Sequence, residues 1–363
     1  TFLLVNHENA FSMASEIRGA IKGSINDLAK NDFQIFKELY DFDITVFDRV
    51  FGTVCCKVIC DYQTPDENSK LFNTRIRDRI CQMSKTLAAA ATTEEFMDDM
   101  VSFYKDFGVG KLGLHKAFRI GHDENGKVEI QPITRIAHVK IDDLVGYEIA
   151  KKKLIDNTEA FVKGLPANNV LLCGDAGTGK STSIKALLNE YYDQGLRMIE
   201  VYKHQFQDLN ELIAQIKNRN YKFIIYMDDL SFEEFEIEYK YLKAVIEGGL
   251  EKRPDNILIY ATSNRRHLIK EDYSDKEGTR QDMHTSDTVQ EKLSLVYRFG
   301  VSIYFGAPDK NEFQKIVSTL AERYGVTLSE EELLAEANKW ELSHGGLSGR
   351  TAQQFIDYLL GKQ

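Results

Sequence analysis

The chain has 363 residues, more than one hydrophobic core usually holds, so we expect two or three domains. Hydrophobic residues make up 43% and charged residues 28%, as in ordinary soluble globular proteins, and no apolar run approaches the length of a membrane span. The net charge of −10 argues against a protein built for general nucleic-acid binding, because such a protein would be basic.

The chain has the features of a cytoplasmic protein. No signal peptide is visible, since Thr1–Asn6 is a short apolar patch without a basic flank. Five cysteines, an odd number in a large chain, do not suggest a disulfide framework, so we expect a reducing compartment. Cys55, Cys56 and Cys60 cluster but have no CxxC pair and no nearby histidine, and we expect free thiols there rather than a metal site.

Residues 1–133 are expected to form a mainly α-helical N-terminal domain. Apolar residues recur every three or four positions in Ile17–Leu28 and in Glu94–Phe107, which is the period of an amphipathic helix. The turn sequence Asp123-Glu-Asn-Gly lies between two apolar runs and predicts a hairpin. This region contains no catalytic motif, and its aromatic-rich stretch Phe33–Phe51 is expected to form a core or to pack on a neighbour.

Residues 134–307 are expected to form an α/β core, and residues 308–363 a helical lid. Short apolar runs alternate with amphipathic segments in the core, which indicates a parallel sheet covered on both faces. The predicted strands are Val170–Cys173, Met198–Tyr202, Phe223–Met227, Ile257–Ala261 and Val301–Phe305. The predicted core helices are Lys180–Tyr191, Gln207–Lys217 and one that ends near Leu250. Three further helical segments without a strand predict the lid, namely Glu312–Tyr324, Glu330–Trp340 and Gly349–Leu360.

A phosphate-binding loop follows the first core strand, because Gly174-Asp-Ala-Gly-Thr-Gly-Lys-Ser181 matches GxxxxGK[ST]. Its glycines let backbone N–H groups turn inward around phosphates, and the start of the next helix adds a favourable field. We expect Lys180 to reach the β- and γ-phosphates of ATP and Ser181 to ligate Mg²⁺. The predicted nucleotide-binding residues are Gly174, Asp175, Ala176, Gly177, Thr178, Gly179, Lys180, Ser181 and Thr182.

Two carboxylates, Asp228 and Asp229, end the strand Phe223–Met227. They should lie at the carboxyl edge of the sheet, where open α/β folds bind ligands. We expect Asp228 to associate with Mg²⁺, usually through water, and Asp229 to orient or deprotonate the attacking water. The alternative is a solvated acidic strand end with no role.

Three other polar residues occupy positions near the expected site. Asn264 follows the strand Ile257–Ala261, where it would bond the γ-phosphate or the attacking water, or simply form a turn. Arg298 precedes the last strand and Arg350 begins a lid helix. Arginine suits the charge on a transferring phosphate, although a lone arginine is more often a surface or ion-paired residue.

Taken in order, these motifs resemble the AAA+ ATPases over about Ile141–Leu360. In that family they correspond to Walker A (the phosphate-binding loop), Walker B (Asp228, Asp229), sensor 1 (Asn264), the arginine finger (Arg298) and sensor 2 (Arg350). More narrowly, the chain looks like a bacterial AAA+ family of predicted ATP-binding proteins whose cellular role is unassigned. The segments that resemble it include Asp143-Leu-Val-Gly-Tyr-Glu, Asp228-Asp-Leu-Ser-Phe-Glu and Tyr260-Ala-Thr-Ser-Asn-Arg-Arg-His-Leu.

The resemblance implies a five-stranded sheet in the order 5-1-4-3-2 with a helical lid, and ATP with Mg²⁺ bound between core, lid and a neighbouring subunit. It implies a homo-oligomer, as a ring or partial ring, in which Arg298 acts on the next subunit's ATP. The backbone around Val145 and Gly146 would hold the adenine, and Arg350 would contact phosphate within its own chain. The family usually has Asp-Glu in Walker B, so the shorter Asp229 is expected to polarise water less directly, with Glu233 or Glu234 as substitutes.

Three functions follow, in order of preference. The first is a Mg²⁺-dependent ATPase that remodels or moves an unidentified macromolecular client. The second is an ATP-dependent assembly switch with slow turnover, which the Asp-Asp pair supports. The third is a nucleic-acid-associated loader, which the net charge of −10 and the lack of a recognisable helix-turn-helix disfavour. No membrane partner is expected.

Overall fold

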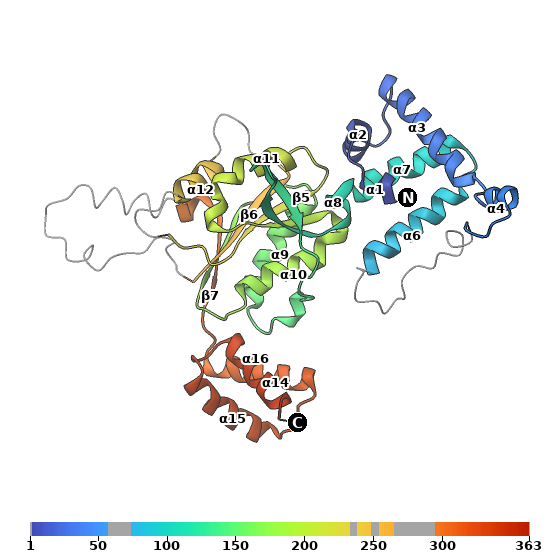
Figure 1. Cartoon of the computed structure of the whole chain (residues 1–363). Helices are drawn as coiled ribbons and strands as arrows, with labels where there is room; N and C mark the ends of the chain where they lie inside the picture. The colour runs from blue at the N-terminus through green and yellow to red at the C-terminus, as the bar shows by residue number, and fades with distance from the viewer. Residues whose placement is uncertain (1, 57–73, 233–237, 248–253, 265–294, 363) are drawn as a thin grey trace, which may run out of the picture. The chain divides into compact units, whose positions relative to one another are not determined.

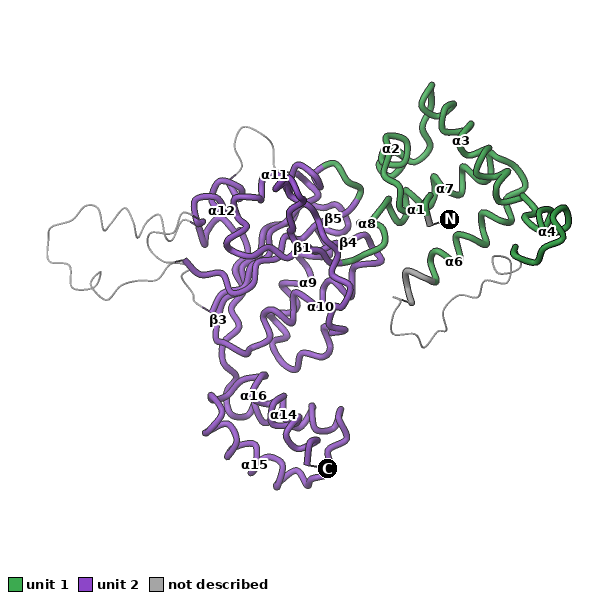
Figure 2. Tube along the Cα trace, viewed as in Figure 1, with its two compact units in different colours: residues 1–116, 218–220 green, residues 117–217, 221–363 purple. Residues whose placement is uncertain are grey.

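The computed structural model describes residues 2–56, 74–232, 238–247, 254–264 and 295–362 (Figure 1). The chain divides into two compact units (Figure 2). Unit 1 contains residues 1–116 and 218–220, and unit 2 contains residues 117–217 and 221–363. Within the described residues, no helix has both the length and the apolar character needed to span a membrane.

Unit 1 is helical, as the sequence predicts. Its helices are α1 (Phe2–Asn6), α2 (Ala10–Arg18), α3 (Ser24–Asp41), α4 (Thr45–Phe51), α6 (Thr74–Ala89), α7 (Thr93–Phe107) and α8 (Gly110–Leu114). Helix α7 is central, since α1, α2, α3, α6 and α8 all contact it, and it confirms the helix predicted at Glu94–Phe107. The core of the unit contains Phe11, Phe33, Phe96 and Met100, all buried.

The helix predicted over Ile17–Leu28 is wrong. Helix α2 ends at Arg18 and α3 begins at Ser24. Gly19 and Gly23 lie between them with φ angles of 72° and 100°, outside the right-handed helical region. The apolar period continues across the break, so periodicity alone did not reveal it.

A buried ion pair holds the short segment 218–220 within unit 1. Arg219 donates from Nε and Nη2 to the two carboxylate oxygens of Glu16, at 2.8 Å each. The backbone N–H groups of Val109 and Asn220 donate to the same carboxylate at 2.9 and 3.2 Å. Glu16 is fully buried and Arg219 nearly so, and each compensates the charge of the other.

Unit 2 is built on one seven-stranded sheet. Its strands are β1 (Ala117–His122), β2 (Val128–Pro132), β3 (Val170–Gly174), β4 (Leu196–Glu200), β5 (Lys222–Met227), β6 (Ile257–Ser263) and β7 (Val301–Phe305), in the order β2-β1-β4-β5-β6-β3-β7. All neighbours are parallel except β1 and β2. Counted as strands 1 to 5, β3 to β7 lie in the order 5-1-4-3-2, which confirms the predicted topology.

The hairpin predicted at Asp123-Glu-Asn-Gly is confirmed as β1–β2, but it belongs to unit 2. Strand β1 pairs in parallel with β4, with Ala117 opposite Met198. The hairpin therefore adds two strands to the predicted five. The division between the units lies after Lys116 and not near Thr134, because these strands bond to the sheet rather than to the helices before them.

Helices pack on the sheet of unit 2 and form the lid after it. The core helices are α9 (Glu148–Val162), α10 (Lys180–Tyr191), α11 (Leu209–Ile216) and α12 (Glu238–Glu247), with short 3-10 turns η1 (Ile141–Asp143), η2 (Tyr192–Gln194) and η3 (Lys203–Asp208). The predicted lid is confirmed as α14 (Lys310–Tyr324), α15 (Glu330–Ser343) and α16 (Gly349–Leu360). It has a small core of its own that includes Phe313, Val317, Ala337 and Phe355.

Candidate nucleotide site

The phosphate-binding loop connects β3 to α10 and lines a cavity of about 590 Å³. Two positions of the loop need glycine, because neighbouring atoms leave no room for a side chain. At Gly174, whose φ is 139°, a Cβ would collide with the carbonyl of Phe305 on the adjacent strand β7. At Gly177, with φ 75°, a Cβ would lie 2.9 Å from Ser348 Oγ and 3.0 Å from Arg350 Cβ, at the start of α16. The loop is therefore packed between the sheet and the lid, and only glycine fits these two positions.

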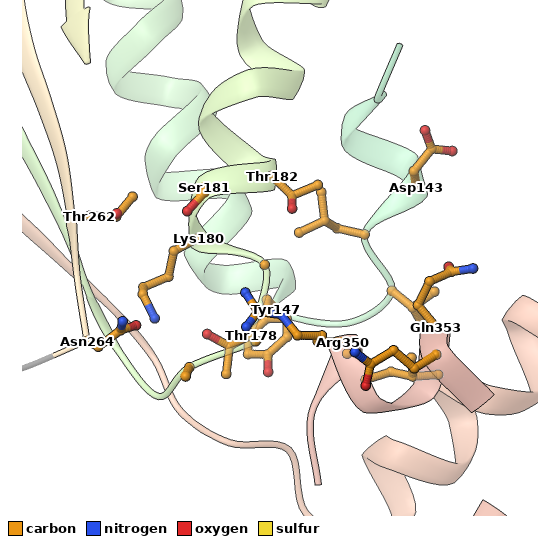
Figure 3. Close-up of a pocket in the computed structure, with 18 of the residues that line it drawn as sticks. Asp143, Tyr147, Thr178, Lys180, Ser181, Thr182, Thr262, Asn264, Arg350 and Gln353 are labelled. Carbon is orange, nitrogen blue, oxygen red and sulfur yellow. The ribbon is translucent and has the colours of Figure 1, made fainter. Parts of the chain in front are cut away.

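Lys180 is held beneath the loop by backbone oxygens. Its Nζ donates to the carbonyls of Gly174 and Asp175, at 2.9 and 2.6 Å. Burial lowers the pKa of the Lys180 ammonium, against the opposing effect of nearby carboxylates such as Asp175 and Asp229. An anion at this position would favour the charged form, which is the environment that a phosphate provides. Figure 3 shows Lys180 among the labelled residues that line the cavity.

Asp228 accepts hydrogen bonds from both sides of the site. Ser181 Oγ and Thr262 Oγ1 each donate to Asp228 Oδ1 at 2.7 Å. Burial acts to raise the pKa of Asp228, but the bonds from Thr262 and Ser181 outweigh it, and the pKa lies below its usual value. The carboxylate is therefore ionised at neutral pH and lies directly beside the hydroxyl at the start of α10.

Asp229 occupies an unusual backbone conformation. Its φ is 50°, in the left-handed region, and Tyr147 is the other described non-glycine residue with positive φ. The Asp229 N–H donates to Thr262 Oγ1 at 2.9 Å, and Asn264 Nδ2 donates to Asp229 Oδ1 at 2.8 Å. Thr262 thus bonds to both acids, and two side chains, one in β6 and one directly after it, hold Asp229 in place.

The remaining wall of the cavity comes from the segment before α9 and from the lid. Tyr147 donates from its hydroxyl to the Gly306 carbonyl at 3.0 Å, and its ring centroid lies 5.2 Å from that of Phe305. Burial raises the pKa of Tyr147 to about 12, so the phenol stays neutral. The other residues of this wall are Asp143, Leu144, Val145, Ile316, Leu320, Gly349, Arg350, Gln353 and Gln354.

An arginine of the lid fixes the turn at the cavity mouth. Arg323 on α14 donates to the carbonyls of Asp142 and Asp143, at 3.1 and 3.2 Å. It also lies 3.4 Å from the Asp143 carboxylate. Lid and core are therefore joined at η1 as well as at the contact between Gly177 and α16, where Arg350 N–H donates to the Gly177 carbonyl at 3.1 Å.

The structure brings most of the sequence-predicted residues to this cavity. The lining contains Val145, Ala176, Gly177, Thr178, Gly179, Lys180, Ser181, Thr182, Asp228, Asp229, Asn264 and Arg350. Gly174 and Asp175 hold Lys180 from behind, and the neighbours of Gly146 line the cavity in its place. Arg298 does not line the cavity and forms an ion pair with Glu247. Glu233 and Glu234 lie outside the described residues.

Sequence reasoning missed Thr262, Tyr147 and the lid residues of the cavity other than Arg350. Thr262 lies in the quoted strand Ile257–Asn264 and is two residues from Asn264, so strand alternation places both side chains on one face. That spacing was the available signal. Tyr147 and the lid glutamines Gln353 and Gln354 gave no comparable signal, because only the tertiary structure brings them to the loop.

The strand order, the loop from β3 to α10 and the helical lid define a nucleotide-binding protein of the AAA+ type. The chain belongs to the family described as "Protein of unknown function (DUF815)", whose model matches residues 113–363. The match begins just before β1, so it includes the hairpin, the core and the lid.

Two named proteins are also similar to parts of the chain. A Replication factor C large subunit from Staphylothermus marinus is 39% identical over 69 residues, which are 19% of this chain and 16% of that protein. A solved structure of a RuvB mutant from Thermotoga maritima has a TM-score of 0.41 and 15% identity, over 60% of this chain and 64% of that one. The chain thus matches less than two thirds of either protein.

Proposed function

We propose that this protein is a Mg²⁺-dependent ATPase that couples ATP turnover to work on a macromolecular client. The observation that supports this most strongly is the group Ser181, Asp228 and Thr262, with Asp229 and Asn264 beside it and Lys180 opposite. It places a phosphate-binding loop, an ionised acid and a second carboxylate on one cavity, which is the set that phosphoryl transfer requires.

The residues present fit a magnesium ion. Ser181 Oγ and Asp228 Oδ1 are hard oxygen donors only 2.7 Å apart at the mouth of the loop, and the lowered pKa keeps Asp228 ionised. When bound, Mg²⁺ would neutralise charge on the β- and γ-phosphates. Ser181 would then give up its hydrogen bond to Asp228 and present its oxygen to the ion.

The other residues have separable roles in this proposal. Loop N–H groups from Ala176 to Thr182 hold the phosphates, and Lys180 exchanges its carbonyl partners for them. Arg350, which begins α16, contacts phosphate from the lid of the same chain. The Val145 backbone and the Tyr147 ring border the base. Asp229 accepts the proton of the attacking water, directly or through a second water, while Asn264 orients that carboxylate.

Two features favour slow turnover, so an ATP-dependent assembly switch is the second candidate. Asp229 is one methylene shorter than the glutamate usual in the AAA+ class. One of its oxygens is also bonded to Asn264 at 2.8 Å, so this oxygen must be released or used through a bridging water. A nucleic-acid-associated loader is the third candidate, and the net charge of −10 counts against it.

The proposal includes a homo-oligomer in which Arg298 completes the neighbour's site. Arg298 precedes β7 and does not line the cavity of its own chain. An arginine finger places its positive charge beside the transferring phosphate, and where one operates it accelerates such reactions by about 10³-fold or more. On this proposal, a ring or partial ring brings Arg298 to the ATP of the next subunit.

Turnover by the purified full chain tests the proposal. Phosphate release from ATP should require Mg²⁺ and should be lost in Lys180→Ala, while Lys310→Ala, a lid surface variant outside the cavity, should match the parent. ATP binding with phosphate release at the level of Lys180→Ala would favour the assembly switch. Absence of nucleotide binding by the parent chain would overturn both readings.

A further inference from the structure

Helix α3 in unit 1 carries apolar side chains on two faces, which lie roughly a third of the way round the helix from each other. Phe33, Phe36 and Tyr40 pack into the core of the unit. On the other face Leu28, Ile35 and Leu39 are exposed, at 70%, 52% and 64%. These three follow at intervals of seven and four residues, so they form one stripe along the helix.

Further exposed apolar side chains follow the end of α3. Phe42 follows the helix directly, and its ring centroid lies 5.8 Å from that of Phe47 on α4. Val50 and Phe51, also on α4, are 71% and 70% exposed. Single exposed apolar residues are ordinary, whereas several of them on two successive helices are typical of surfaces that bind a partner.

Acidic side chains border the stripe. Asp32 is four residues after Leu28 and three before Ile35, so it lies within the stripe between them, and Glu38, three residues after Ile35, lies beside it. With Asp27 they carry three negative charges, and none of the three forms an ion pair with a described residue. The two lysines of the helix form ion pairs with other acids, Lys30 with Glu94 and Lys37 with Asp41, although the charge of Asp27 also acts on Lys30.

We propose that this α3 outer face, made of Leu28, Ile35 and Leu39 with Asp27, Asp32 and Glu38, docks a basic amphipathic helix of a partner protein. An apolar stripe along an 18-residue helix, about 27 Å long, matches the anchor spacing of a second helix laid beside it. The acidic border selects a partner whose apolar face is flanked by lysine or arginine.

The same border disfavours other occupants. Anionic lipid and nucleic acid would bring further negative charge against Asp27, Asp32 and Glu38. A second copy of this chain that docked by the same face would place the same three acids against each other. The docked helix would therefore belong to a different, basic protein segment, and this conclusion holds whether or not the chain hydrolyses ATP.

A synthetic leucine–lysine peptide that forms an amphipathic helix as long as α3 tests the proposal on the full chain. Fluorescence anisotropy should show saturable binding at physiological salt. Two control peptides should not bind, one with glutamate in place of lysine and one with the same residues scrambled so that the stripe is lost. The variant Leu28→Ser/Ile35→Ser/Leu39→Ser should weaken binding at least about tenfold, because it removes the exposed anchors.

Two further variants separate apolar docking from charge alone. Asp27→Asn/Asp32→Asn/Glu38→Gln should weaken binding and flatten its salt dependence. The matched control Leu165→Ser/Leu342→Ser removes exposed leucines of unit 2 and should bind like the parent. Equal binding of the scrambled peptide, or unchanged binding by the triple serine variant, would overturn the proposal. Two other results would also overturn it, each in the absence of peptide binding. One is binding of the parent chain to phosphatidylglycerol vesicles that the triple serine variant loses, and the other is self-association of the parent chain that this variant loses.

Discussion

The amide of Asn264 donates to the carboxylate of Asp229 at 2.8 Å, and so joins the ends of two neighbouring parallel strands, β6 and β5. Asp229 has a φ of 50°, a conformation that Asp and Asn tolerate better than longer side chains do. The side chain at this position therefore sits on a left-handed backbone and lies close enough to Asn264 to accept its hydrogen bond.

Asp229→Asn should keep this conformation and the fold, because asparagine also tolerates left-handed φ. Nucleotide affinity should be close to that of the parent, whereas hydrolysis should fall by about 10²-fold or more with the loss of the proton acceptor. Equilibrium titration and phosphate release measure the two quantities. If Asp229→Asn turns over ATP like the parent, another group accepts the proton, and Glu233 and Glu234 are the next to test.

The variant Asp229→Glu distinguishes the effect of side-chain length on hydrolysis from the effect of backbone strain on stability. The longer side chain would approach the water more closely, but glutamate should cost about 1 kcal/mol in the left-handed region. We expect a small loss in thermal stability, together with faster hydrolysis if the short side chain limits the rate. A variant that is both less stable and no faster would show that length is not the limit.

Thr262→Val should disturb both acids at once. The hydroxyl donates to Asp228 and accepts from the Asp229 N–H, so its removal leaves a partly buried donor unpaired, at a cost of about 1–3 kcal/mol. Asp228 also loses a bond that lowers its pKa, so its pKa rises. The acid limb of Mg²⁺-dependent nucleotide binding should therefore move to higher pH. Thr262→Ser keeps the hydroxyl and is the matched control; an acid limb that stays in place in Thr262→Val would contradict the assigned role.

Mixing two inactive variants tests whether Arg298 acts across a subunit interface. Arg298→Ala keeps a complete phosphate-binding loop, and Lys180→Ala keeps Arg298, so mixed assemblies contain some complete sites. We expect partial recovery of ATPase activity and a specific activity that rises with protein concentration. Glu247→Gln, which removes the ion pair between Arg298 and Glu247, should retain activity. Absence of recovery despite demonstrated co-assembly, or full activity of Arg298→Ala alone, would leave Arg298 with a structural role.

Glu16→Gln should destabilise unit 1 by about 3–5 kcal/mol, because Arg219 would keep its charge in a buried site without a compensating carboxylate. Trp340, the single tryptophan, lies in the lid and so reports on unit 2. Thermal melting followed by far-ultraviolet circular dichroism should shift more than melting followed by tryptophan fluorescence. Equal shifts by both probes would mean that the two units unfold together, and no shift would show that the pair contributes little.

Much of this fold could be predicted because its signals are local. The apolar run before the loop and the glycines within it specify β3 and α10 to within a residue, and the same holds for β7. The break between α2 and α3 was missed because the apolar period runs through Gly19 and Gly23. The place of β1–β2 in the sheet was also missed, since the pairing of Ala117 with Met198 joins residues far apart in sequence.

The candidate site divides in the same way. The loop, the two acids and Asn264 follow strands directly, so their positions at the sheet edge could be derived from topology. Tyr147 lies in the cavity wall because its ring packs against Phe305, a contact that the local sequence does not reveal. Gln353 and Gln354 needed the lid to fold over the loop. Residues that reach a site only through tertiary packing leave no mark on the local sequence pattern.

The hairpin β1–β2 has a practical consequence for dissecting the protein. Because β1 pairs with β4, it satisfies the outer N–H and C=O groups of that strand. A fragment that begins at residue 134 would lack β1, so β4 would become an exposed edge strand with unpaired N–H and C=O groups. Such an edge pairs readily with other molecules and promotes aggregation. A fragment begun at residue 113 would retain β1 and β2 and keep that edge paired. Insolubility of the shorter fragment would then reflect the cut and say nothing about the stability of the nucleotide-binding fold.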